Sequence, residues 1–171
     1  MSQSEQPQEQ AHGPLLAKAG KYLTFTLADE TYGMGILKVK EIIGMMSVTS
    51  VPRTPEFVKG VINLRGKVIP VVDLRLKFAM EAIPYTDRTC IIVVEIDTDE
   101  QTVLIGIVVD AVSEVLNIRE EEIENTPTFG SRLDTDYIMG MAKMDGGVKI
   151  LLNIDHVLSS QEISALEQTG K

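Results

Sequence analysis

The stretch that decides the fold is residues 57 to 78, FVKGVINLRGKVIPVVDLRLKF. An apolar run lies between two glycines, the turn at Arg65-Gly66 reverses the chain, and residues 68 to 72 form the returning strand of a β-hairpin. Asp73 follows where the N-cap of a helix is expected. The stretch therefore predicts a β-hairpin followed by a short helical turn.

Arg65 does not suit the turn that the hairpin requires. A tight hairpin turn favours Asn, Asp or Gly at its first central position, because the backbone there often needs a positive φ angle. A residue that breaks a local rule is a candidate for function. We therefore treat Arg65 as a candidate binding residue.

The two halves of the chain repeat each other at two constant spacings. The repeat matches glycines, a glutamate and an N-cap residue as well as apolar positions. The matched pairs are Gly33 with Gly106, Glu41 with Glu114, Gly60 with Gly140, Gly66 with Gly146, and Asp73 with Asn153. Arg65 is matched by Asp145, an ordinary turn residue, so the cation is specific to the first copy.

The repeat predicts a mainly β protein built from two similar barrels. Each copy carries roughly five short strands separated by turns, which is typical of a small barrel, and neither copy is long enough to bury a large core alone. We expect two five-stranded barrels that share a core, with short helical turns and a C-terminal helix. A cleft between the halves is a possible partner site.

The expected boundaries follow from composition and pattern. The polar residues 1–19 form a disordered tail, and 20–165 form the folded domain. The first barrel covers about 20–83, the second about 84–158, and a helix about 159–168, with Ser159 and Glu162 as its capping box. The spacing of apolar residues from 36 to 43 fits either a helical turn or a strand.

The composition restricts the partners and the compartment. The net charge is −9 among 171 residues, which disfavours nucleic acid or an anionic membrane as the main partner. No apolar run approaches the ~20 residues that span a bilayer, and the single cysteine, Cys90, fits a reducing compartment. We expect a cytoplasmic protein without membrane insertion.

Residues suited to catalysis or metal binding are few. His12 and His156 form no nucleophile set with Cys90 and no zinc cluster. The glycine-rich residues 60–67 differ from a phosphate loop in spacing, and Val68 stands where Ser or Thr would hold magnesium. We therefore expect no catalytic residue, metal or cofactor; an enzyme would instead require a polar pocket with converging ionisable groups.

Three segments resemble the CheW family, the coupling proteins of bacterial chemotaxis. They are YGMGILKVKEI (32–42), the hairpin FVKGVINLRGKVIPVVDLR and GIVVDAVSEVL (106–116), and the resemblance extends over about residues 21–162. It implies two intertwined five-stranded SH3-like barrels and a signal-transduction role as a scaffold. A protein of this family bridges the regulatory domain of the two-component histidine kinase CheA and the cytoplasmic tips of methyl-accepting chemoreceptors.

The resemblance also implies site residues. Val39, Glu41, Arg65 and Val115 match receptor-binding positions of the family, and Gly60 matches a position associated with kinase coupling. The protein would be recruited to membrane-bound receptor arrays and could associate with itself in array rings. The alternative is an SH3-like coupling module for a CheA-type kinase in surface sensing or twitching. The sequence does not identify the receptors or the CheA-facing apolar residues.

Overall fold

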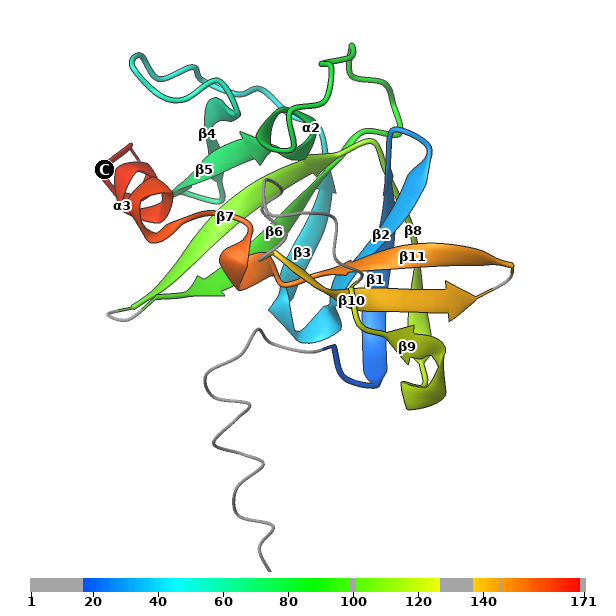
Figure 1. Cartoon of the computed structure of the whole chain (residues 1–171). Coiled ribbons are helices and arrows are strands. Elements are labelled where there is room, and N and C mark those ends of the chain that lie inside the picture. The colour runs from blue at the N-terminus through cyan, green and yellow to red at the C-terminus, as the bar shows by residue number, and fades with distance from the viewer. Residues whose placement is uncertain (1–16, 99–100, 127–136, 145, 170–171) are drawn as a thin grey trace, which may run out of the picture.

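The computed structural model describes residues 17–98, 101–126, 137–144 and 146–169, which form a mainly β protein (Figure 1). The strands are β1 Gly20–Leu27, β2 Glu30–Gly35, β3 Val39–Gly44, β4 Val58–Leu64, β5 Lys67–Asp73, β6 Cys90–Asp97, β7 Thr102–Val109, β8 Ala111–Ile118, β9 Ile123–Glu124, β10 Ile138–Met144 and β11 Gly147–Leu152. The helices are the 3-10 turns η1 Ile36–Lys38, η2 Glu120–Glu122 and η3 Ile154–His156, and the α-helices α2 Leu74–Lys77 and α3 Ser160–Thr169.

The strands form two sheets, and each sheet takes strands from both halves of the sequence. One has the order β8-β1-β2-β11-β10-β9 and the other the order β3-β6-β7-β5-β4. The hairpin β1–β2 thus lies between strands of the second half, and β6–β7 lies between strands of the first half. The expected division into barrels at 20–83 and 84–158 does not follow the sheets, because the two copies exchange their first hairpins.

Although the hairpins are exchanged, matched residues of the two copies make matching strand pairings in the two sheets. β5 pairs in parallel with β7 through Val71 and Gly106, and β11 pairs in parallel with β2 through the matched residues Leu151 and Gly33. The pairing of β9 with β10 gives one sheet its sixth strand. Its counterpart in the other sheet is a single bridge between Thr49 and Val61. The two barrels are therefore similar, as the repeat predicts.

A shared core joins the sheets. The largest cluster of buried residues combines Leu23 of β1, Ile92 of β6, Ile107 of β7 and Leu152 of β11. A row of four aromatic rings also crosses between the halves, with centroid separations of 5.9, 6.1 and 4.9 Å along Phe25, Tyr32, Phe78 and Tyr137. The prediction of two intertwined barrels with one core is confirmed.

Strand β1 is buried more completely than its alternating pattern predicts. Both Phe25 and Thr24 are buried, although they point to opposite faces. The Thr24 hydroxyl lies beside the irregularity in the β1–β8 pairing, donates to the Glu114 carbonyl at 2.7 Å and accepts from the Glu114 N–H at 3.2 Å. Because the backbone of β8 satisfies this hydroxyl, a polar residue can lie inside the barrel.

The local helix signals are correct. Asp73 accepts from the Leu76 N–H, and Ser159 and Glu162 form the capping box that begins α3. The Glu162 carboxylate also pairs with Lys77 of α2 at 2.9 Å, which holds α3 against α2 and beside β5. None of the helices among the described residues is long and apolar enough to cross a membrane. Most of the expected tail, residues 1–16, lies outside the described residues.

Candidate functional site

Arg65 occupies the strained turn position that the sequence indicates. Its φ angle is 51°, and that of Gly66 is 88°. The side chain of Asn63 accepts a hydrogen bond from the Gly66 N–H at 2.8 Å, which holds the turn. Because the turn is short and braced, the Arg65 side chain projects from a stiff base. Asp145, its counterpart, lies outside the described residues.

The guanidinium of Arg65 pairs with Glu41, another predicted site residue. Nη1 donates to Oε2 at 3.0 Å, and Nη2 donates to Oε1. The hydrogen bonds from Arg65 lower the pKa of the Glu41 carboxyl below its ordinary value. β3 and the β4–β5 turn are thereby joined by a two-pronged ion pair, and the two site residues act as one unit.

The pair remains open to solvent on its arginine side. The Arg65 side chain is 69% exposed, whereas that of Glu41 is 30% exposed. A guanidinium carries five N–H donors, of which Glu41 engages two. The remaining donors can bind a second carboxylate without breaking the first pair.

Val39 and Val115 occupy different places relative to this pair. Val39 lies two residues before Glu41 on β3, but a bulge between them turns the two side chains to opposite faces, and Val39 packs against the shared core. Val115 lies on β8, in the other sheet, and is 50% exposed. The structure thus brings Glu41 and Arg65 together, turns Val39 toward the core and places Val115 on the second barrel.

Val115 has a counterpart that the sequence-based site omits. Ile42 occupies the matched position on β3 and is 43% exposed. β3 and β8 are the edge strands of their sheets, so each barrel presents one exposed apolar residue on an edge. Leu37, on η1 just before β3, is 90% exposed. The repeat would have identified Ile42, but nothing in the pattern marks Leu37.

Gly60 contributes to the site from inside the fold. Its φ angle is 142°, and a Cβ added to it would overlap the carbonyl oxygen of Thr49. Thr49 exchanges two hydrogen bonds of 2.9 Å with Val61. Gly60 therefore lets the segment after β3 lie against β4.

The chemical groups at the site are suited to contacts with another protein. Among the described residues, no three His, Cys, Asp or Glu side chains are grouped as a metal site. The Cys90 thiol donates to the Arg88 carbonyl at 3.3 Å, and His156 is exposed. The site combines an exposed cation held by a carboxylate with apolar residues on two strand edges, an arrangement suited to binding a protein surface.

Comparisons with known proteins agree with this architecture. The family model described as the CheW-like domain matches residues 21–162. The chain is 41% identical over 151 residues to the chemotaxis protein CheW of Klebsiella aerogenes, covering 88% of this chain and 89% of that one. It is 33% identical over 158 residues to the chemotaxis protein CheW of Rhizobium meliloti, covering 88% and 99%.

A solved structure shows the same fold. The crystal structure of the scaffolding protein TtCheW from Thermoanaerobacter tengcongensis superposes with a TM-score of 0.74 at 38% identity. The match covers 84% of this chain and 95% of that one. The family match, the level of identity and the shared architecture lead to one conclusion: the chain belongs to the family of CheW-like domains.

Proposed function

We propose that this protein is a non-catalytic adaptor that couples chemoreceptors to the histidine kinase CheA in chemotaxis signalling. The observation that carries the proposal is the Arg65–Glu41 pair, which holds an exposed guanidinium on a strained turn. Two relatives at 41% and 33% identity are named chemotaxis proteins, and a solved relative is named a scaffolding protein.

The receptor contact uses the guanidinium and the strand edges. A carboxylate at the cytoplasmic tip of a receptor binds the N–H donors of Arg65 that Glu41 leaves open. Apolar residues of the helical tip pack on Ile42 and Val115, which are exposed on the edges of the two sheets. Glu41 keeps the guanidinium oriented, so less side-chain freedom is lost on binding.

The kinase contact uses the ends of the barrels. Val68 and Val148 are matched residues of the β4–β5 and β10–β11 hairpins, and they are 51% and 50% exposed. Apolar residues at such positions can pack against the regulatory domain of CheA, or against a second copy of this chain in an array ring. These contacts recruit the protein to receptor arrays at the membrane.

Reconstitution tests the proposal. Receptor-containing membranes, CheA and this protein are mixed, and CheA autophosphorylation is measured with and without attractant. We expect this protein to raise the autophosphorylation rate and to make it sensitive to attractant. If the rate is the same with and without this protein, the adaptor function is wrong.

A matched pair of variants connects the activity to the site. Arg65→Glu should abolish receptor-controlled activation and weaken receptor binding by about tenfold or more. Arg119→Glu is the control, because Arg119 is also an exposed arginine in an ion pair with a glutamate, but it precedes η2 far along the chain. If both variants behave alike, overall charge accounts for the effect and Arg65 has no specific role.

A further inference from the structure

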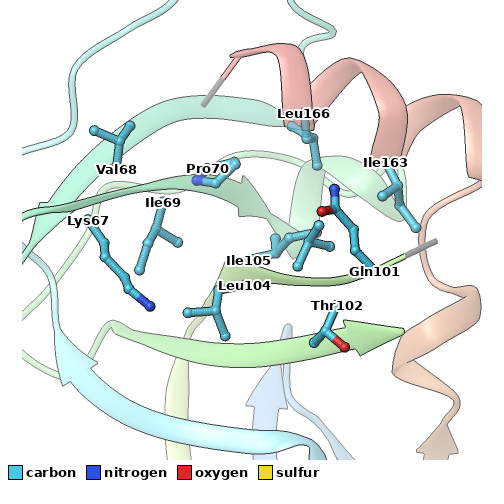
Figure 2. A pocket seen from close by; sticks show the side chains of 11 residues that line it. Lys67, Val68, Ile69, Pro70, Gln101, Thr102, Leu104, Ile105, Ile163 and Leu166 are labelled. Carbon is cyan, nitrogen blue, oxygen red and sulfur yellow. The ribbon is translucent and has the colours of Figure 1, made fainter. Parts of the chain in front are cut away.

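A cavity of about 360 Å³ opens between β5, β7 and α3 (Figure 2). Its volume is at the lower end of the range of ligand pockets. Ile105 of β7 and Ile163 and Leu166 of α3 form an apolar wall. Among the described residues that line it, Lys67 alone is charged, and Figure 2 shows its ammonium end directed toward Leu104.

The cavity exists because two parallel strands separate. β5 and β7 pair only from Val71 and Gly106 onward, so residues 67–70 and 102–105 are not joined. On their other sides, β5 pairs with β4 and β7 pairs with β6 along these residues. The opening is therefore bounded by one unpaired edge of each strand.

Pro70 accounts for the last unpaired position of β5. Leu64 and Lys67 flank the two-residue turn, so alternate pairs along the β4–β5 hairpin are hydrogen-bonded, and Val61 and Pro70 form a non-bonded pair. Accordingly, the N–H and C=O of Val61 point away from β5 and form hydrogen bonds with Thr49. The nitrogen of Pro70 then faces β7, and it has no hydrogen to donate.

The second copy shows the arrangement without proline. Ile150 occupies the matched position on β11 and pairs with Tyr32 of β2, so that ladder begins one residue earlier. Each ladder has three pairs, so the missing donor at Pro70 coincides with a ladder displaced by one residue, and residues 147–149 of β11 are likewise unpaired with β2. By the same alternation, the N–H and C=O of Val68 also face the opening.

We infer that this opening binds an extended peptide segment of a partner protein, which adds as a strand along β5. Its backbone pairs with the N–H and C=O of Val68, as in strand addition to a sheet edge, although β5 is an interior strand whose side toward β7 is open only over residues 67–70. An apolar side chain of the peptide enters the space beside Ile105, Ile163 and Leu166. An acidic side chain pairs with Lys67. This site is separate from the Arg65–Glu41 pair. It shares Val68 with the proposed kinase contact but uses the backbone of that residue rather than its side chain, and its test does not require the adaptor function.

Peptide selection tests the site directly. A phage-displayed library of random 12-residue peptides is selected on the full-length protein, and the selected peptides are synthesised. We expect sequences with an acidic residue near alternating apolar residues. Nuclear magnetic resonance should map binding to the Val68 amide and to the methyl groups of Ile105 and Ile163. Peptides that map elsewhere, or a library that yields no binder, would overturn the inference.

Variants and modified peptides then test each contact. Lys67→Glu should weaken binding about tenfold, whereas Lys21→Glu, the same charge change on an exposed lysine of β1, should change it less than twofold. Pro70→Ile restores the donor found in the second copy, should extend the ladder to β7, and should also weaken binding. N-methylation of the peptide residue that faces Val68 should abolish binding. This test changes only the peptide, so it does not depend on the stability of a protein variant. If the N-methylated peptide binds equally well, or if decanoate fills the cavity while the peptides do not, strand addition is wrong.

Discussion

Arg75 and Asp110 form a partly buried ion pair that ties the two halves of the chain together. Nε and Nη2 of Arg75 each donate to the Asp110 carboxylate at 2.8 Å. The same carboxylate accepts from the N–H of Ala28 at 2.9 Å, and Arg75 also donates to the Glu81 carbonyl at 2.9 Å. The pair therefore joins α2 to the β7–β8 connection and to the β1–β2 turn.

Removing one partner of this pair should destabilise the whole domain. Arg75→Gln leaves the Asp110 carboxylate with only the Ala28 N–H, so we expect a loss of about 2 kcal/mol in the free energy of unfolding, measured with urea. Arg119→Gln, which removes a more exposed ion pair, should cost less than about 1 kcal/mol. Equal losses in the two variants would show that the Arg75–Asp110 pair contributes no more than a surface pair.

Two partly buried carboxylates should make the protein sensitive to acid. Burial raises the pKa of both Asp110 and Glu162, but hydrogen bonds outweigh it. Arg75 and the Ala28 N–H bind Asp110, and Ser159 and Lys77 bind Glu162, so the pKa of each carboxyl lies below its ordinary value. A lowered pKa in the folded state contributes stability that is present above the unfolded-state pKa near 4 and is lost as the pH falls through the folded-state value.

The measurement is urea unfolding between pH 6 and pH 3. The free energy of unfolding should fall as the pH drops below about 4.5, and the fall should be shallower in Glu162→Gln, since this variant has one fewer carboxylate to protonate. Glu56→Gln, which removes an exposed carboxylate before β4, serves as the control and should follow the wild type. A Glu162→Gln profile parallel to that of the wild type would contradict the prediction.

Exchanging the charges of Glu41 and Arg65 separates orientation from recognition. The double variant Glu41→Arg with Arg65→Glu can re-form an ion pair between β3 and the turn, but it places a carboxylate where the guanidinium was. If receptors recognise the guanidinium, the exchange should unfold like the wild type while receptor binding stays about tenfold or more weaker. Recovery of receptor binding in the double variant would mean that the pair acts only within the fold.

Gly60→Ala should destabilise the protein more than changes at other glycines. The added Cβ overlaps the Thr49 carbonyl, and the positive φ angle adds strain, so we expect a loss of about 3 kcal/mol in the free energy of unfolding. Gly140→Ala, the matched change, meets the Glu124 carbonyl at 3.0 Å and should cost less. Gly35→Ala meets no atom within 4 Å and should cost within about 0.5 kcal/mol. A Gly60→Ala protein as stable as Gly35→Ala would show that the close approach of Thr49 does not constrain this position.

Local features of this fold could be predicted because their causes lie within a few residues. The strained Arg65 turn, the Asp73 N-cap and the Ser159–Glu162 capping box each depend on short-range geometry. The sequence identified Arg65 as exceptional because turn chemistry limits what that position accepts. The shared core followed from the length of each copy.

Long-range pairing could not be predicted in the same way. The hairpins β1–β2 and β6–β7 have matching patterns, so either arrangement buries the same kinds of side chain, and the exchange is not encoded locally. The Arg65–Glu41 pair depends on closure of the barrel, which brings β3 to the β4–β5 turn across 24 residues of sequence. Separately, the alternating pattern of β1 did not reveal that β8 would satisfy the buried hydroxyl of Thr24.

The exchanged hairpins also determine the order in which the protein can be completed on the ribosome. The strands β3 to β7 are all present once residue 109 has been synthesised, whereas the β1–β2 hairpin finds its partners only among strands that begin at residue 111. Until then, Leu23, Phe25 and Leu27 belong to a nascent segment without its neighbouring strands. The residues of β1 and β2 are thus synthesised before β3 to β7 but enclosed after them, which exposes an apolar hairpin to chaperones and to aggregation during translation.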